Sequence, residues 1–327
     1  MPPRGKAIVS PKLPPRVAGS SGFIMKKDFL SINDFSREEI LKLLQKSAEL
    51  KQMRIDNITY HPLKGKSLGM IFSKHSTRTR ISFEVGMFEL GGQALFLTTD
   101  QLQLTRGETV EDSAKVLSRY LDGIVIRTYD HEEVINFARH ASIPVINGLT
   151  DLNHPVQILA DLFTIQEKLG KIEDIKVAYL GDGNNVAYSW MLGASIMGIH
   201  LAVACPKDHQ PKWPESMGSL GKVEVLEDPL EAVHNADVLY TDVWVSMGQE
   251  SQSEEKIKRL QPYQINQKLV AAANDGVLVM HCLPAHRDME ISSEVMDGKN
   301  SIVFDQAENR LHVQKAILDA LLSPPKQ

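Results

Sequence analysis

The sequence predicts an α/β fold made of two doubly wound, parallel-sheet domains joined by long helices. Short apolar runs alternate with amphipathic stretches of helical length from Asp28 onward, which is the pattern of parallel strands covered by helices. The chain has 327 residues, enough for two domains at roughly 100–200 residues each. Hydrophobic residues make up 43% and charged residues 24%, so the chain has the material for two cores.

The elements follow from these runs in chain order. We expect strands where short apolar runs occur, at residues 67–72, 123–126, 144–146, 176–180, 201–204, 237–240, 277–280 and 302–304. We expect helices where apolar residues recur at helical spacing, at residues 36–53, 79–90, 109–120, 131–138, 155–169, 187–197 and 306–322. The helix that begins at His154-Pro155 lies where the two α/β halves join.

The domain boundaries are expected near residues 25 and 151. Residues 1–24 read as a disordered basic extension, because five prolines interrupt any hydrophobic periodicity and residues 1–27 carry six basic residues and no acidic one. An organelle transit peptide is the less favoured alternative for this segment. Residues 25–151 form the first domain, to which a C-terminal helix at 306–322 returns, and residues 152–305 form the second.

Composition excludes several classes of protein. The formal charge is −5, with 36 basic against 41 acidic residues, which argues against a general nucleic-acid binder and requires a local pocket for any anion. The apolar runs are far shorter than the ~20 residues of a membrane helix. Cys205 and Cys282 cannot form a disulfide framework, so we expect a reducing compartment, the cytoplasm. No metal-ligand spacing such as C-x-x-C or H-E-x-x-H occurs in the sequence, and we expect no metal.

Reactive residues follow the predicted strands, where open parallel sheets bind their ligands. Ser76-Thr77-Arg78-Thr79-Arg80 lies between a strand and a helix that Gly91-Gly92 closes. Unpaired N–H groups at a helix N-terminus favour an anion, and hydroxyl and guanidinium groups suit phosphate. Capped helix ends with exposed arginines are the simpler reading, but two arginines and three hydroxyls in five residues favour an anion site.

This segment resembles the carbamoyl-phosphate loop of the aspartate/ornithine transcarbamylase family. A second motif of that family appears at His154-Pro155-Val156-Gln157, and the similarity runs from about residue 26 to residue 322. The resemblance implies that residues 25–151 bind carbamoyl phosphate. It assigns the contacts to Ser76, Thr77, Arg78, Thr79, Arg80, Gln103, Arg127, His154, Gln157, Cys282, Leu283 and Arg310.

Within that set the resemblance implies different tasks. Arg127, His154 and Thr79 would stabilise negative charge on the carbonyl oxygen, and Gln157 and the Leu283 carbonyl would orient the carbamoyl amide. For His154, a proton donor and a neutral hydrogen-bond donor both remain open.

Two further motifs match the members of the family that use ornithine. Asp242-Val243-Trp244-Val245-Ser246-Met247-Gly248 and His281-Cys282-Leu283-Pro284 correspond to their D-x-x-x-S-M-G and H-C-L-P patterns. The resemblance implies that residues 152–305 bind L-ornithine through Asn185, Asp242, Ser246 and Met247. Cys282, helped by Asp242, would accept a proton from the attacking δ-amine, whose pKa is near ~10.

The expected reaction is therefore carbamoyl transfer from carbamoyl phosphate to ornithine, giving citrulline and phosphate, without a cofactor. The resemblance also implies a homotrimer with sites at subunit boundaries, where Gln103 reaches a neighbour's site. Aspartate carbamoyl transfer and a non-catalytic regulatory role are the alternatives. A dinucleotide site at Gly181-Asp182-Gly183 is disfavoured, because Val186 stands where the third glycine belongs.

Overall fold

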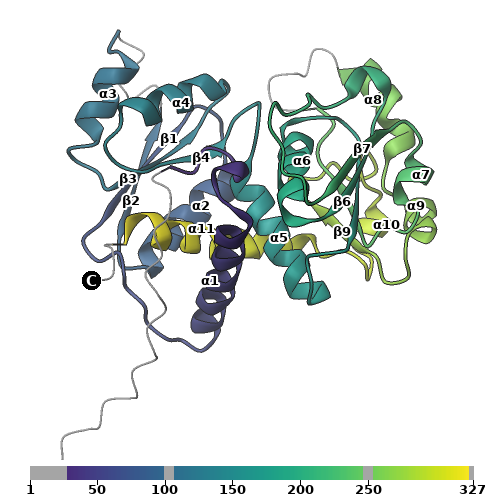
Figure 1. The fold of residues 1–327 in the computed structure, drawn as a ribbon, viewed down its shortest axis with the longest axis horizontal. Helices are drawn as coiled ribbons and strands as arrows, with labels where there is room; N and C mark the ends of the chain where they lie inside the picture. The colour runs from purple at the N-terminus through teal and green to yellow at the C-terminus, as the bar shows by residue number, and fades with distance from the viewer. Residues whose placement is uncertain (1–27, 99–106, 246–252, 324–327) are drawn as a thin grey trace, which may run out of the picture.

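Two parallel sheets lie side by side and are bridged by helices (Figure 1). The computed structural model describes residues 28–98, 107–245 and 253–323. The predicted α/β fold with two parallel-sheet domains is confirmed, and every pairing between named strands is parallel. No helix in these described ranges combines the length and the apolar character needed to cross a membrane.

The first sheet has the strand order β2-β1-β3-β4. Its strands are β1 (Ser67–Phe72), β2 (Gln93–Thr98), β3 (Gly123–Arg127) and β4 (Val145–Leu149). Its helices are α1 (Arg37–Ile55), α2 (Thr77–Glu89), α3 (Val110–Leu117) and α4 (His131–His140), after a 3₁₀ turn η1 (Ile32–Asp34). The central strands β1 and β3 are almost entirely buried, which explains their continuous apolar sequences.

The second sheet has the strand order β7-β6-β5-β8-β9. Its strands are β5 (Lys176–Leu180), β6 (His200–Ala204), β7 (Lys222–Leu226), β8 (Val238–Thr241) and β9 (Leu278–His281). The elements between and after them are α6 (Asn185–Met197), η4 (Lys207–His209), α7 (Pro229–Val233), α8 (Ser253–Leu260), η6 (Gln261–Tyr263), α9 (Gln267–Ala272) and α10 (Ser293–Met296). Gly181 directly follows β5 and has φ 126°. A Cβ at this position would lie 2.9 Å from the indole nitrogen of Trp244.

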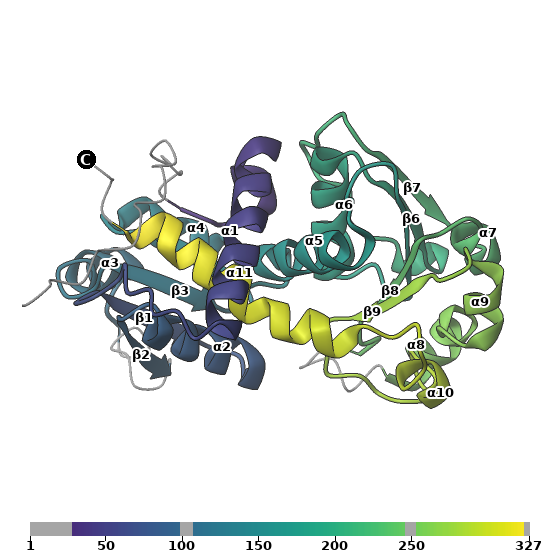
Figure 2. The ribbon, with the colours of Figure 1, turned by 90° about the horizontal axis from the view of Figure 1, so that it is seen from below.

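Two long helices connect the sheets. The nearly all-buried α5 (Pro155–Leu169) follows β4 and leads into β5, and α11 (Val303–Leu322) starts beside the second sheet and runs back under the first (Figure 2). At its far end Leu322 covers the start of β3, where a Cβ on Gly123 would come within 2.6 Å of the leucine side chain. The predicted return of the C-terminal helix to the first domain is confirmed.

One predicted strand is not formed, and two observed strands were not predicted. Residues 302–304 are not a strand: Ile302 touches the sheet edge through one hydrogen bond to Val279 and then begins α11. The strands β2 and β7 have no counterpart among the predicted ones. Both lie at sheet edges and are only partly buried. In β7, Lys222 and Glu224 interrupt the apolar sequence. In β2, the apolar run at residues 94–97 was overlooked.

Candidate active site between the two sheets

The loops that follow the strands of both sheets meet in one region. Arg78, in the first turn of α2, interacts electrostatically with Cys282 and Asp242, which follow β9 and β8 of the other sheet. Arg127, the last residue of β3, interacts with Cys282 and with Arg310 of α11. The predicted residues of both domains therefore face each other, as the strand-end rule implies.

The phosphate loop leaves part of its side chains free. Ser76 is the N-cap of α2 but its side chain makes no capping hydrogen bond, and Thr77 and Arg78 are exposed. Arg80 is directed elsewhere: its Nε donates to Glu84 at 2.9 Å, and its guanidinium lies 3.8 Å from the ring centre of Phe96 in β2. Among the loop arginines, Arg78 is thus the one turned toward the second domain.

Arg310 connects three predicted residues from different elements. Its Nη2 donates to Thr79 Oγ1 at 2.9 Å. Its Nη1 donates to Gln157 Oε1 and lies 3.2 Å from His154 Nε2. One guanidinium from the C-terminal helix therefore fixes the start of α2 and the start of α5, because its planar fork can donate in two directions.

The same contact fixes the state of His154. A guanidinium can only donate, so Nε2 of His154 accepts and the proton sits on Nδ1. Burial, together with Arg310 and Arg127, holds the pKa of His154 well below its usual value. The imidazole is therefore neutral, and its Nδ1–H is buried with no partner in the structure. This geometry favours the neutral hydrogen-bond donor among the two predicted roles.

Buried donors accumulate here without acceptors. Within residues 28–98, 107–245 and 253–323, the Nε atoms of Arg127 and Arg310 have no hydrogen-bond partner, like Nδ1 of His154. Burial, followed by the neighbouring Arg310 and Arg78, lowers the pKa of Arg127 to about 10. Buried polar groups are normally paired, so converging unpaired donors with cationic charge indicate a site for an anionic ligand.

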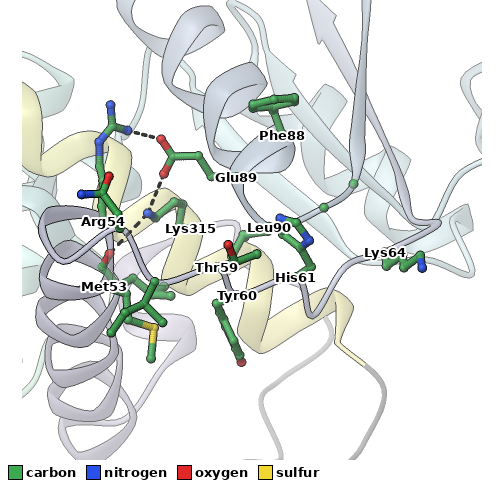
Figure 3. Close-up of a pocket in the computed structure, with 15 residues that line it drawn as sticks. Met53, Arg54, Thr59, Tyr60, His61, Lys64, Phe88, Glu89, Leu90 and Lys315 are labelled. Atoms are coloured by element: carbon green, nitrogen blue, oxygen red, sulfur yellow. Dashed lines mark hydrogen bonds and ion pairs between the residues drawn. The ribbon is translucent and has the colours of Figure 1, made fainter.

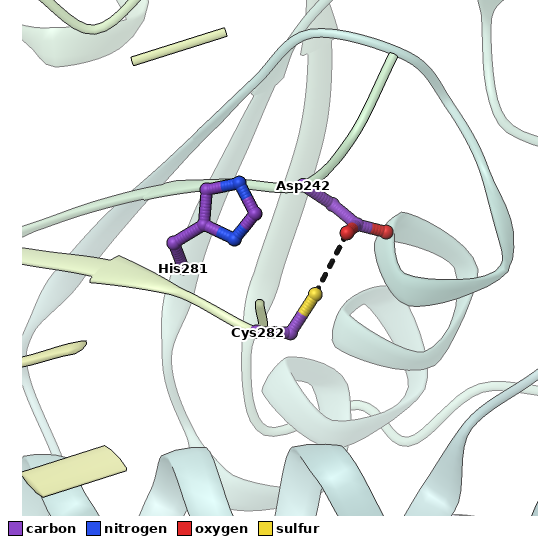
Figure 4. A group of neighbouring side chains, drawn as sticks. All are labelled: Asp242, His281 and Cys282. Atoms are coloured by element: carbon purple, nitrogen blue, oxygen red, sulfur yellow. Dashed lines mark hydrogen bonds between the residues drawn. The ribbon is translucent and has the colours of Figure 1, made fainter. Parts of the chain in front are cut away.

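The first wall of the site is formed by the hydrogen-bond donors Arg78, Arg127, His154 and Arg310. Asp242 is the centre of the second wall, which it forms with Cys282 (Figure 4). Its Oδ1 accepts from the thiol of Cys282 at 2.7 Å and from the Val243 amide at 2.8 Å, and its Oδ2 accepts from Asn184 Nδ2 at 2.7 Å. Asn184 is held in place because its Oδ1 caps α6. Burial and then Asp242 raise the pKa of the Cys282 thiol well above its usual value, so the thiol is protonated and acts as a donor.

The turn after β9 is held by His281. The Leu283 N–H donates to His281 Nδ1 at 2.9 Å, so the ring proton is on Nε2, which faces Glu290 Oε1 at 3.0 Å. This contact supports Leu283 at φ 57°, an unusual conformation for leucine, next to the cis peptide bond to Pro284.

One group of metal-binding residue types occurs in the described part of the chain. Asp242, His281 and Cys282 offer ligand atoms within 4.8 Å of one another. Both ring nitrogens of His281 and the thiol of Cys282 already have hydrogen-bond partners, so an ion would have to displace them. These hydrogen bonds stabilise the turn after β9, and the three residues do not form a preformed metal centre.

The remaining predicted ligands lie apart from these two walls or outside the described ranges. Asn185 Nδ2 donates to the backbone carbonyl of Thr150, after β4, and so bridges the two sheets. Gln103, Ser246 and Met247 lie outside the described residues.

Sequence reasoning missed four residues that support the site. Asn184, Glu290, Asp161 and Gln306 hold the predicted residues in place from behind. None belongs to a motif quoted above. Asn184 could have been found as an N-cap, because asparagine is favoured directly before a helix.

A cavity of about 670 Å³ lies elsewhere in the first domain (Figure 3). It opens between the C-terminal ends of α1 and α2, where Glu89 pairs with Arg54 and with Lys315 of α11. None of the candidate site residues lines it.

The chain matches two family models over most of its length. Residues 27–167 match the "Aspartate/ornithine carbamoyltransferase, carbamoyl-P binding domain", and residues 173–321 match the "Aspartate/ornithine carbamoyltransferase, Asp/Orn binding domain".

Similar proteins agree with these models. A protein from Syntrophus aciditrophicus named ornithine carbamoyltransferase is 55% identical over 306 residues, covering 91% of this chain and 100% of its own. A protein of the same name from Bacillus subtilis is 53% identical, covering 90% and 94%. The solved ornithine carbamoyltransferase from Pyrococcus furiosus superposes with a TM-score of 0.89 at 48% identity, covering 93% of this chain and 99% of its own.

Proposed function

Because this chain belongs to the aspartate/ornithine carbamoyltransferase family, we propose that it transfers the carbamoyl group of carbamoyl phosphate to the δ-amine of L-ornithine, giving L-citrulline and phosphate. The observation that carries the proposal is the pair of facing walls: unpaired cationic donors on one side and the Asp242–Cys282 pair on the other. The carboxylate of Asp242 suits an acceptor that carries an ammonium group better than an acidic acceptor. The relatives that are 55% and 53% identical to this chain are named ornithine carbamoyltransferase.

Carbamoyl phosphate is held by the first wall. Ser76, Thr77 and Arg78 bind its phosphate, and the exposure of Thr77 and Arg78 supports this role. Arg127 and the Nδ1–H of His154 donate to the carbonyl oxygen. Since both are buried and already oriented, they stabilise the charge that develops there without reorganisation.

Ornithine lies against the second wall, where the carboxylate of Asp242 compensates the positive charge of the side-chain ammonium group. The neutral δ-amine attacks the carbonyl carbon, a C–N bond forms, and the C–O bond to phosphate breaks with the electron pair leaving on phosphate. The proton of the amine passes to the Asp242–Cys282 pair. In this arrangement Asp242 is the member that can accept it, because the thiol keeps its own proton. Asn185, Ser246 and Met247 would hold the amino-acid end.

The finer statements belong to the same proposal. The reaction serves arginine biosynthesis or, in reverse, arginine breakdown, in the cytoplasm; unpaired Cys205 and Cys282 fit a reducing compartment. The chain works as a homotrimer in which Gln103 completes a neighbour's site. The first domain carries large apolar side chains that are exposed: Ile81 is 52%, Phe88 78% and Tyr120 73% exposed. They support an interface between subunits on this domain.

The test is a direct assay of the purified chain with carbamoyl phosphate and either L-ornithine or L-aspartate. We expect citrulline with ornithine and no carbamoylated product with aspartate. His154→Ala is the matched negative control, since it removes the buried donor without touching the phosphate loop. Product with aspartate alone would overturn the choice of substrate, and product with neither would overturn the enzyme activity.

A further inference from the structure

Asp161 is a fully buried carboxylate that none of the chemistry above uses. It lies on α5 one helical turn after Gln157 and has no exposed surface. Its Oδ1 accepts from Gln157 Nε2 at 2.8 Å and from Gln306 Nε2 of α11 at 2.7 Å. A buried charge is costly, so its retention between two helices calls for a reason.

Two chains of donors converge on this carboxylate. From the first wall, Arg310 donates to Gln157 Oε1, which leaves the Gln157 amide nitrogen to face Asp161. From the second wall, the backbone N–H of His281 donates to Gln306 Oε1 at 2.9 Å, which leaves the Gln306 amide nitrogen to face Asp161. Both amides donate to the same oxygen, Oδ1 of Asp161, and a negative charge on the carboxylate strengthens both hydrogen bonds.

The outer ends of these chains are parts of the candidate site. Arg310 also holds Thr79 and His154, and His281 begins the turn that carries Cys282 and Leu283. The two walls come from different sheets, yet a continuous run of hydrogen bonds joins them behind the site through one side chain.

We propose that Asp161 is a positioning residue shared by both halves of the site, whose carboxylate orients Gln157 toward the carbamoyl group and anchors the His281 turn through Gln306. The inference rests on the proposed carbamoyl transfer, because it assigns Asp161 to the same reaction. It touches neither substrate and acts through the two amides.

The charged and titratable groups around Asp161 come from each element packed against it. They are Arg310 on α11, Tyr240 on β8 and Cys282 after β9. Burial raises the pKa of Asp161 to about 7, against the opposing effect of its hydrogen bonds and of Arg310. Protonation would remove the charge that both amides face, so the alignment weakens as the pH falls through that value.

The test compares Asp161→Asn with Thr164→Val. Thr164 is equally buried on α5 and also bonds to α11, through Asn309 at 3.0 Å, but its link does not lead to the site. We expect D161N to lower kcat by about 10- to 100-fold at pH 8, since a charged hydrogen-bond acceptor is lost from two oriented amides. T164V should stay within about threefold of the wild type, as expected for a change that leaves the oriented groups in place.

A second readout separates positioning from general damage. Inorganic phosphate should bind D161N at least as tightly as the wild type in calorimetry, because a negative charge is removed from behind Arg310 while kcat falls. The ratio of wild-type to D161N kcat should shrink between pH 8 and pH 6, as Asp161 of the wild type becomes neutral.

Three results would overturn the role of Asp161: D161N with kcat within about twofold of the wild type, T164V as impaired as D161N, or phosphate affinity lost in parallel with kcat. A wild-type chain that forms no citrulline would instead overturn the proposed function, and with it this role. An active wild type with an equally active D161N would overturn the role of Asp161 alone.

Discussion

Arg78 and Arg80 stand two residues apart in one loop, yet their surroundings differ. Arg78 is exposed toward Cys282 and Asp242, whereas Arg80 pairs with Glu84 and stacks on Phe96. The family resemblance assigned both arginines to carbamoyl phosphate. The motif alone does not reveal which of the two side chains pairs with a neighbouring residue instead.

This difference makes a matched pair of variants. Arg78→Ala should raise the carbamoyl-phosphate KM by about 10- to 150-fold, the usual effect of losing a charge-assisted hydrogen bond. Thermal unfolding should stay nearly unchanged, since Arg78 is exposed. Arg80→Ala should leave KM close to the wild type. If the two variants lose equal affinity, Arg80 also reaches the phosphate.

Cys282 is a second residue whose state follows from one neighbour. Its thiol donates to Asp242, and that carboxylate together with burial raises the thiol pKa. In a Cys205→Ser background, where Cys282 is the one remaining cysteine, alkylation by iodoacetamide should be slow at pH 7 and accelerate as the pH rises above 9.

Asp242→Asn should accelerate that alkylation at neutral pH, because removing the carboxylate lowers the thiol pKa. The rate is measured by mass spectrometry over a pH series, with the unsubstituted Asp242 chain as control. A variant that reacts more slowly than its control would mean that Asp242 activates the thiol instead of keeping it protonated.

Motifs revealed the residues that face the site, but not those behind it. Arg78, His154 and Asp242 occur in motifs that resemble those of the aspartate/ornithine transcarbamylase family, and this resemblance was enough to find them. Asp161 and Gln306 are single polar residues within helices, and nothing local distinguishes them from surface positions. Their role depends on two helices about 145 residues apart in sequence meeting in space.

At the scale of elements, the buried central strands were predicted, and of the four edge strands β4 and β9 were predicted whereas β2 and β7 were not. The bounds of β1 and β5 agree with prediction to the residue, because both are buried on two faces. β7 pairs on one side and includes Lys222 and Glu224, so its sequence resembles a loop. The apolar residues at 302–304 read as a strand because a buried helix start has the same composition over three positions.

The helix α11 holds the first domain through a partly buried ion pair. Lys315 is 4% exposed, and its Nζ donates to Glu89 of α2 at 2.7 Å. Lys315→Met should lower the free energy of unfolding by about 1–3 kcal/mol. The loss is smaller than for a buried carboxylate left without any partner, because Glu89 still pairs with Arg54.

Lys168→Met is the control for that variant. Lys168 pairs with Asp305 at a similar distance of 2.7 Å, but both side chains are about a third or more exposed, so the loss should stay below about 1 kcal/mol. Urea unfolding at one fixed protein concentration measures both, since assembly would shift the apparent stability. Equal losses in the two variants would contradict the importance of burial.

At the scale of the whole molecule, the site exists only where two domains meet, and a third contribution is proposed from a neighbouring subunit. Gln103→Ala and Arg127→Ala chains should each be nearly inactive. When they are mixed, unfolded and refolded together, about a quarter of the sites in random hybrids should be intact if Gln103 acts in trans. Recovered citrulline formation measures this; no recovery would mean that Gln103 serves its own subunit's site.

The position of α11 also bears on how the protein is made. Ile317, Leu318 and Leu322 share one core with Leu68 and Val125 of the first sheet. A ribosome delivers those strands roughly 200 residues before the helix that covers them, at about 5–20 residues per second. The nascent first half therefore stays without this helix until the second half has been translated.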